Sequence, residues 1–310
     1  MNKILAFAAL LLLAGCSQQP AEQQLNVYNW SEYIPHELVQ QFSQETGIKV
    51  NYATYESNEA MYAKIALLKG EGYDLVFPST YFVAKMANNQ LLQPLDKSQL
   101  TQLGNLDPAL LDKAYDPGNR YSLPFMWGSA AIAVNSKVVA ADAIDSWADL
   151  WQPRWQGQLQ LSDDVRELFQ IALTTLGHDG NSSDLQQIEQ AYGQLQKLMP
   201  NVRAFNSDAQ HAAFLNGDIN VGVIWNAEAY KAQQELPELR YIYPREGAIF
   251  WIDCMAIPVG AKNVSAAHKF IDFLLRPDVM AGITNQVRYP NAVPASRTQI
   301  RPEILADPNI

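Results

Sequence analysis

Short apolar stretches alternate with helical periodicity along most of the chain. The stretches with strand-like character are residues 25–28, 48–55, 73–77, 130–134, 219–225 and 250–257. Apolar positions at helical spacing predict a helix that begins near Pro35 and ends before Gly47, and a second helix capped by Ser57. Strands that alternate with helices in this way predict an α/β fold in which helices flank mixed, mostly parallel sheets.

Residues 1–15 have the pattern of a lipoprotein signal peptide. Lys3 provides a positive charge, residues 4–13 are apolar, and a Leu-Ala-Gly-Cys run ends at Cys16. This apolar run is too short to cross a bilayer, which needs about 20 residues. We therefore expect cleavage before Cys16, lipidation of Cys16, and a polar tether over residues 16–24. The alternative is an ordinary secretory signal in which Cys16 occurs by chance.

The size and charge of the mature chain limit its organisation and its partners. Removal of the signal peptide leaves 295 of 310 residues, more than one typical domain, so two lobes are expected. It also removes the charge of Lys3 and changes the formal net charge from −10 to −11. An acidic protein disfavours nucleic acid as a partner and favours cations. Lipidation of Cys16 would leave Cys254 without a disulfide partner.

The sequence lacks common signatures of catalysis and cofactor binding. It contains no Gly-rich nucleotide loop, no nucleophile elbow and no histidine pair at zinc-binding spacing, and its histidines are isolated from one another. No enzymatic activity, cofactor or metal is therefore expected.

Aromatic and acidic residues occur together where predicted strands end. Trp30, Ser31, Glu32 and Tyr33 directly follow the first strand, and ligands of open α/β sheets bind outside the carboxyl ends of strands. This loop is therefore a candidate wall of a binding site. The alternative is that its rings simply cover the core.

Trp251 and Asp253 lie two positions apart in the last predicted strand, so their side chains point to the same face. The surrounding residues 249–259 are otherwise apolar, and a carboxylate buried there needs a cation or several hydrogen-bond donors. Asp253 is thus a candidate anchor for a cationic ligand. An internal arginine or lysine partner is the alternative.

A second acidic pair begins the helix that is predicted to run through Leu176. Asp164 and Glu167 are three residues apart, so both carboxylates can face a cleft. An acid at the N-cap followed by glutamate three positions later is also the pattern of a capping box. The sequence by itself favours neither interpretation.

Further aromatic residues occupy comparable positions. Ser79 and Tyr81 follow a strand, Trp225 ends one, and Tyr289 follows the helix near residues 278–286. Together with the segments above, they predict a cleft lined with rings and four carboxylates. Such a cleft suits an aliphatic polyamine, because carboxylates meet its ammonium groups while ring faces cover its methylenes and add cation–π attraction.

A family resemblance rests on six tracts, which are residues 27–33, 54–58, 73–76, 146–151, 205–208 and 249–253. They resemble the spermidine/putrescine-binding component of bacterial ABC importers, and the similarity is nearly continuous from Leu25 to about Ser296. The resemblance implies the two-lobe fold of type II periplasmic binding proteins, with the ligand in a cleft between the lobes. It places residues 25–128 and 252–296 in the first lobe and residues 129–251 and 297–310 in the second.

The resemblance also implies a role for each matched residue. The expected aromatic cage consists of Trp30, Tyr33, Tyr81, Trp225, Trp251 and Tyr289. The expected ammonium ligands are Glu32, Asp164, Glu167 and Asp253, and the expected polar contacts are Ser31, Ser79 and Ser207. In the family, a helical segment beyond the position of Ile310 supplies one amide contact, which this sequence does not contain.

The sequence therefore predicts a monomeric periplasmic lipoprotein that binds spermidine or putrescine and delivers it to an ABC permease in the inner membrane. Its own attachment to a membrane would be the lipid on Cys16. Two alternatives stay open, a polyamine-sensing adaptor for a membrane signalling receptor and an enzyme that acts on glycans. The enzyme would need an acid pair about 5 to 9.5 Å apart, one acid having a raised pKa, whereas the predicted ligand carboxylates are expected to stay ionised.

Overall fold

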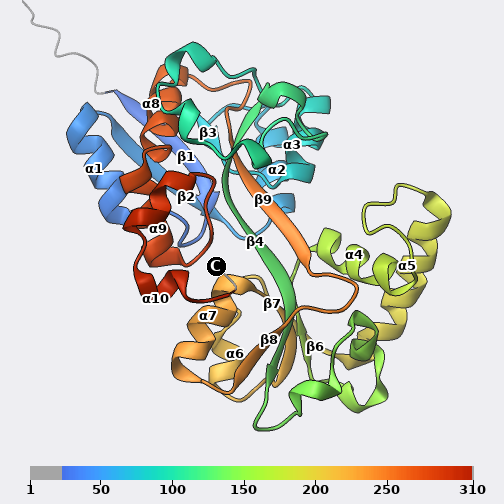
Figure 1. Cartoon of the computed structure of the whole chain (residues 1–310). Coiled ribbons are helices and arrows are strands. Elements are labelled where there is room, and N and C mark those ends of the chain that lie inside the picture. Colours follow the sequence, from blue (N-terminus) through green and yellow to red (C-terminus); the bar gives the residue numbers. More distant parts are fainter. Residues whose placement is uncertain (1–22, 309–310) are drawn as a thin grey trace, which may run out of the picture.

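The computed structural model describes residues 23–308 and consists of two lobes. The long strands β4 (Ser122–Asn135) and β9 (Ile249–Ala256) pass from one lobe to the other (Figure 1). This two-lobe α/β arrangement confirms the predicted fold class. The predicted signal peptide, the lipidation site Cys16 and most of the tether lie outside the described residues.

The strands form one mixed sheet in the order β2-β1-β3-β9-β4-β7-β5-β6, with β8 paired to β4. The other strands are β1 (Gln24–Trp30), β2 (Lys49–Tyr55), β3 (Leu75–Val76), β5 (Leu159–Leu161), β6 (Val202–Phe205), β7 (Val221–Trp225) and β8 (Leu239–Ile242). Strand β1 is parallel to β2 and β3, and β5 is parallel to β6 and β7. The pairs β3–β9, β4–β7, β4–β8 and β4–β9 are antiparallel. The described sheet is thus less parallel than predicted, because β4 and β9 run opposite to their neighbours.

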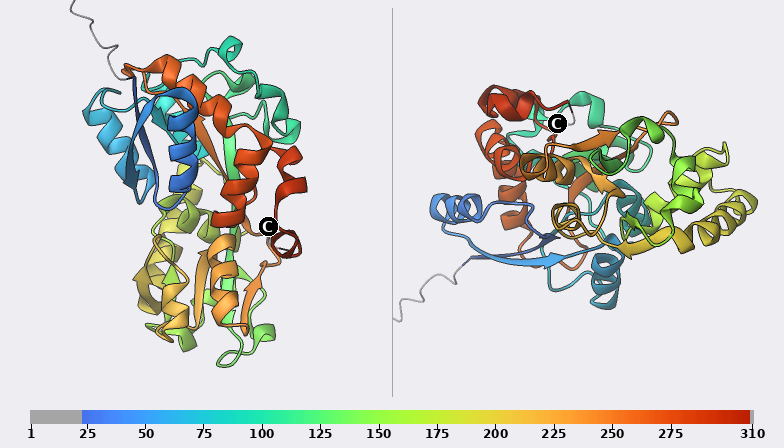
Figure 2. Two further views of the ribbon diagram at one scale, coloured as in Figure 1. Left: turned by 90° about the vertical axis from the view of Figure 1, so that its left-hand side faces the viewer. Right: turned by 90° about the horizontal axis from the view of Figure 1, so that it is seen from below.

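Helices cover the sheet in both lobes (Figures 1 and 2). They are α1 (His36–Thr46), α2 (Asn58–Leu67), α3 (Thr80–Asn88), α4 (Val165–Thr175), α5 (Leu185–Leu198), α6 (Ala212–Leu215), α7 (Asn226–Glu235), α8 (Val264–Leu274), α9 (Pro277–Val287) and α10 (Pro302–Leu305). The predicted ends of the first two helices are present. Gly47 ends α1 with a φ of 71°, and Ser57 caps α2 by accepting a hydrogen bond from the amide of Ala60. None of the described helices has the length and apolar character that a membrane span requires.

Each lobe has its own apolar core. Residues of β1 to β3, β9, α8 and α9 form the first core, in which Phe77 is completely buried. In the second lobe, Ile132 and Val134 of β4 contact one cluster and Ala133 contacts another, because successive side chains of a strand point to opposite faces. The strand is therefore buried on both faces, which explains its continuous apolar run.

The C-terminal segment packs on α9, and its described part ends near α7. Ile300 and Ile304 pack against Ala281 of α9, and the amide of Arg301 donates a 2.8 Å hydrogen bond to the side chain of Asn285. Ile300, Arg301 and Ile304 therefore contact α9, whereas Pro308 lies near Asn226, Tyr243 and Ala248. The short helix α10 has no core of its own, so its apolar side chains bury against the nearest apolar helix face. The lobe boundaries, including the one at residue 297, stay predictions.

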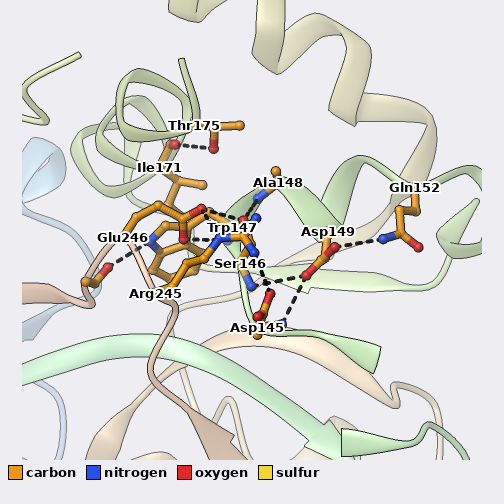
Figure 3. Close-up of polar contacts among 11 residues, drawn as sticks. Asp145, Ser146, Trp147, Ala148, Asp149, Gln152, Ile171, Thr175, Arg245 and Glu246 are labelled. Atoms are coloured by element: carbon orange, nitrogen blue, oxygen red, sulfur yellow. Dashed lines mark hydrogen bonds and ion pairs between the residues drawn. The ribbon is translucent and has the colours of Figure 1, made fainter. Parts of the chain in front are cut away.

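One of the tracts behind the family resemblance has a structural role in the second lobe (Figure 3). Ser146 and Asp149 form a capping box at the start of the 3₁₀ helix Trp147–Trp151. The hydroxyl of Ser146 also donates a hydrogen bond to Glu246. This contact fixes the start of the 3₁₀ helix to the turn that leads into β9.

Candidate binding site

A cavity of about 170 Å³ is walled by residues of both lobes. The thirteen residues that the sequence predicts for the site all line it, namely Trp30, Ser31, Glu32, Tyr33, Ser79, Tyr81, Asp164, Glu167, Ser207, Trp225, Trp251, Asp253 and Tyr289. They come from the end of β1 and the loop after it, the residues after β3, the start of α3, the start of α4, the segment after β6, strands β7 and β9, and the segment after α9. The fold therefore brings the predicted residues together around one space. This volume is below the ~300 Å³ typical of drug-sized sites, which favours a slender ligand.

Asp253 is almost completely buried in the wall of the cavity, with 5% of its surface exposed. Its carboxylate accepts hydrogen bonds from the hydroxyls of Ser79 (2.6 Å) and Tyr33 (2.7 Å). Within residues 23–308, no lysine or arginine forms an ion pair with it, so the alternative of an internal cationic partner is wrong for that part of the chain. Burial raises the pKa of Asp253 to about 7, although the two hydroxyl donors oppose this shift.

The sequence left helix capping and ligand contact open for the two acids at the start of α4, and the structure gives the two acids different contacts. Asp164 is the N-cap residue, and its carboxylate accepts a 3.0 Å hydrogen bond from the amide of Glu167. The carboxylate of Glu167 instead accepts from Ser162 Oγ (2.5 Å) and from the indole of Trp225 (3.0 Å). Capping therefore accounts for Asp164 but not for the orientation of Glu167, which is buried against the cavity.

Burial shifts the pKa values of both Glu167 and Asp253 in the protein without ligand. Burial raises the pKa of Glu167 to about 8, and the neighbouring charge of Asp164 adds to the shift. With the pKa of Asp253 at about 7, the two buried carboxyls are partly protonated at neutral pH when the cavity holds no cation. The reason is that low-dielectric surroundings disfavour the charged form. A bound ammonium group would favour the ionised form and lower both pKa values.

The aromatic residues form a connected wall. The rings of Trp251 and Tyr289 are 5.1 Å apart and nearly perpendicular, and Tyr33 contacts Tyr289 in the same manner at 6.0 Å. The indole of Trp30 donates to the carbonyl of Phe77 at 3.0 Å. These contacts fix the ring planes before a ligand binds.

Trp251 carries an unsatisfied donor. Its Nε1 atom is buried and has no hydrogen-bond partner among the described residues, an arrangement that typically costs about 1–3 kcal/mol. The ring packs against the backbone of Gly128, where an added Cβ would come within 2.5 Å of the Trp251 ring and of Asn226 Oδ1. Glycine at this position therefore lets the ring of Trp251 approach β4.

The polar contacts expected from serines are only partly free for a ligand. The hydroxyl of Ser79 donates to Asp253, and the hydroxyl of Ser207 accepts a 2.9 Å hydrogen bond from the amide of Asp163. Ser31 is exposed at the edge of the cavity. The hydroxyl of Ser79 thus orients the carboxylate of Asp253.

Fourteen other residues line the cavity and were not predicted from the sequence. They are Tyr55, Glu56, Asn58, Thr80, Arg166, Gln170, Asn181, Asp208, Ala209, Glu228, Lys231, Ile249, Phe250 and Val287. Two of these residues, Glu228 and Lys231, belong to α7 and form a 2.8 Å ion pair. They follow Trp225 by three and six positions, and this helical spacing from a predicted site residue was the available signal.

Comparison with known proteins confirms the family resemblance. Residues 37–310 match the family described as bacterial extracellular solute-binding protein. The chain is 48% identical over 304 residues to the spermidine/putrescine-binding periplasmic protein of Escherichia coli (strain K12), which covers 98% of this chain and 87% of that protein.

Solved structures agree with the sequence comparison. The spermidine/putrescine ABC transporter substrate-binding protein PotD from Streptococcus pneumoniae is similar with a TM-score of 0.76 and 37% identity, over 92% of this chain and 88% of that one. The PotD lipoprotein of Treponema pallidum is similar with a TM-score of 0.81 and 31% identity, over 89% and 88% of the two chains.

Proposed function

We propose that this chain, which belongs to the bacterial extracellular solute-binding proteins, binds a polyamine between its lobes and delivers it to an ABC permease. One observation carries the proposal. Asp253 and Glu167 are buried in an aromatic cavity, and neither pairs with a lysine or arginine within residues 23–308. A cation that enters the cavity supplies the missing partner.

A polyamine suits this cavity through both its ammonium groups and its methylenes. Its ammonium groups can donate charge-assisted hydrogen bonds to the buried carboxylates, and such bonds are stronger than neutral ones. The rings of Trp30, Trp225 and Trp251 can cover the methylenes between the ammonium groups. Micromolar affinity corresponds to about −8 kcal/mol, which several such contacts supply after the loss of ligand freedom. Binding then favours the closed arrangement of the lobes, because ligand contacts come from both of them.

The proposal describes a binding protein rather than an enzyme. A glycan-acting enzyme also uses an acid with a raised pKa, which Glu167 and Asp253 have. Here, however, hydroxyl and indole donors hold these carboxyls as acceptors. The proposal includes a periplasmic, monomeric protein with a lipid on Cys16, and the Treponema pallidum relative that is named a lipoprotein supports the lipid.

Calorimetry on the chain from residue 17 onward tests the proposal. The panel contains putrescine, spermidine, lysine, arginine and a neutral oligosaccharide. We expect the two polyamines to bind, while lysine and arginine bind poorly because the cavity acids repel their carboxylates. Tight binding of the oligosaccharide, or of the amino acids in preference to polyamines, contradicts the proposal. Polyamine uptake by a deletion strain then separates transport from sensing, since a sensing adaptor leaves uptake unchanged.

A further inference from the structure

Lys231 of α7 places a cation of the protein itself at the cavity. Its Nζ atom lies 2.8 Å from Glu228 Oε1 and 3.8 Å from Glu32 Oε2. Glu32 follows β1 of the first lobe, and α7 belongs to the second. The ammonium group of Lys231 therefore reaches across the cleft toward an acid that the sequence assigns to the ligand.

Glu228 holds this ammonium group in place. The carboxylate of Glu228 is 5% exposed and accepts a 2.6 Å hydrogen bond from Nδ1 of His211. Burial alone would raise its pKa, but the contacts with His211 and Lys231 outweigh burial and lower the pKa to about 2. Glu228 is thus ionised at neutral pH and fixes the side chain of Lys231, which is only 30% exposed.

The backbone of Glu32 gives this acid a defined position. Glu32 has a φ of 52°, in the left-handed region that residues other than glycine rarely adopt. Such conformations are maintained where the surrounding structure determines them, often at ligand sites. Glu32 is also 81% exposed, so it lies at the mouth of the cavity and not beside the buried acids.

The side chain of Lys231 is itself an aminobutyl group, the unit that ends a putrescine or spermidine molecule. We propose that Lys231 acts as a built-in ammonium group that occupies the Glu32 end of the cleft and makes the site selective for diamines over triamines. This inference rests on the proposed function. Asp164, Glu167 and Asp253 then receive two ligand ammonium groups, and a third ammonium group would meet the like charge of Lys231.

The other cation of the cavity wall has a different partner. Arg166 donates a 2.7 Å hydrogen bond to Asn181, and both residues lie in the second lobe. Arg166 therefore does not bridge the lobes as Lys231 does. Selectivity is expected to depend on Lys231 in particular and not on the total positive charge of the protein.

Calorimetry with putrescine and spermidine on Lys231→Met tests the inference. We expect the affinity for spermidine relative to putrescine to rise about three- to fivefold, the range that a partly exposed charge pair accounts for. Lys231→Arg keeps the cation and should keep the parent ratio. Lys269→Met removes the same charge from an exposed position on α8, outside the cavity, and should also keep it.

The outcomes distinguish the inference from the function on which it rests. If the parent protein binds neither polyamine, the proposed function fails and the inference fails with it. If the parent binds both and Lys231→Met has the parent ratio, or shifts it no more than Lys269→Met does, only the inference is overturned. Glu32→Gln provides a second measurement: it should weaken spermidine binding in the Lys231→Met background more than in the parent, because Lys231 no longer occupies Glu32. Equal effects in both backgrounds would also overturn the inference.

Discussion

The hydroxyl of Tyr81 donates a 2.7 Å hydrogen bond to Asp164 Oδ2 and thereby joins the two lobes across the cavity. Tyr81 belongs to α3 of the first lobe, and Asp164 is the residue that caps α4 of the second. A single carboxylate thus both begins a helix and holds the lobes together. Changes at Tyr81 should therefore act on closure more than on folding.

For Tyr81→Phe, we expect faster dissociation of a bound polyamine, because the closed form loses a hydrogen bond to a charged group, worth about 1.5–3 kcal/mol. Stopped-flow tryptophan fluorescence measures the dissociation rate. Tyr192→Phe removes the same hydroxyl from an exposed position on α5 and serves as the control. Equal rates for the parent and both variants would show that the bond does not stabilise closure.

Asp253→Asn should abolish most of the binding while leaving the fold intact. The loss of one partner of a desolvated charge pair typically costs 2–5 kcal/mol of affinity. Thermal stability should not fall, because a neutral amide at this buried position avoids the desolvation of a carboxylate. Its oxygen can still accept from one of the two hydroxyls of Ser79 and Tyr33, and its NH2 group can donate to the oxygen of the other. Calorimetry and a melting curve decide it. Parent-like affinity in a folded variant would refute Asp253 as the anchor.

Polyamine binding should release protons near neutral pH. Burial raises the pKa of Asp253 from 3.8 to about 7 and that of Glu167 from 4.5 to about 8, and a bound cation favours the ionised forms. Affinity should therefore increase as pH rises from 6 to 8. Calorimetry in two buffers with different ionisation enthalpies measures the released protons, and a pH-independent affinity would contradict the prediction.

The same shifts affect the ligand-free protein with the opposite sign. An acid whose pKa is higher in the folded state binds more protons when folded, so stability falls as pH rises through this interval. The free energy of unfolding without ligand should therefore decrease between about pH 4 and pH 8. Asp253→Asn should reduce this decrease, which chemical denaturation at several pH values measures.

Substitutions in α4 should separate capping from ligand binding. Asp164→Ala loses the cap and should lower stability by about 1 kcal/mol, together with affinity. Asp164→Asn keeps a capping oxygen, so affinity should fall with little change in stability. Glu167→Gln should lower affinity only. A lower melting temperature of Glu167→Gln with an unchanged dissociation constant would indicate a role in the helix and not in binding.

Gly128→Ala should destabilise the protein by about 1–3 kcal/mol, the usual penalty of overpacking. Its Cβ would lie within 2.5 Å of both Asn226 Oδ1 and the Trp251 ring. Polyamine affinity should fall as well, because the ring of Trp251 must move. Gly104→Ala is the control, since no atom lies within 4 Å of its added Cβ. Equal melting temperatures for the two variants would refute the close approach of Trp251 to β4.

Local signals were enough to predict the elements whose ends are set by single residues. Gly47 and Ser57 mark the boundaries of α1 and α2 as expected. Strand β4 is much longer than the predicted residues 130–134. The prediction was too short because Pro124 and Gly128 interrupt the apolar pattern of the strand, and its pairing with β9 shifts register near Pro124. The antiparallel passage of β4 and β9 through the sheet depends on contacts between distant segments, which periodicity does not reveal.

The cavity-lining residues could be predicted where rings and acids lie at the ends of strands, as at Trp30 and Trp225. Glu228 and Lys231 were missed, because an acid and a base three apart on a helix have the same pattern as an ordinary solvent-exposed pair. The burial of Glu228 depends on tertiary packing, which also brings His211 to its carboxylate. The raised pKa values of Asp253 and Glu167 likewise depend on burial, which the sequence does not specify.

Two of the connections between the lobes, strands β4 and β9, pair with each other and are not single flexible linkers. Strand β4 pairs with β9 from Ser122 to Ala130, with one shift of register near Pro124. Rotation of one lobe against the other must therefore be absorbed as a change of twist along a continuous ladder of hydrogen bonds. The ladder resists twisting. Its twist in the absence of a load therefore determines how much of the ligand contact energy is used to close the lobes. Substitutions along β4 that never touch the ligand can then tune affinity.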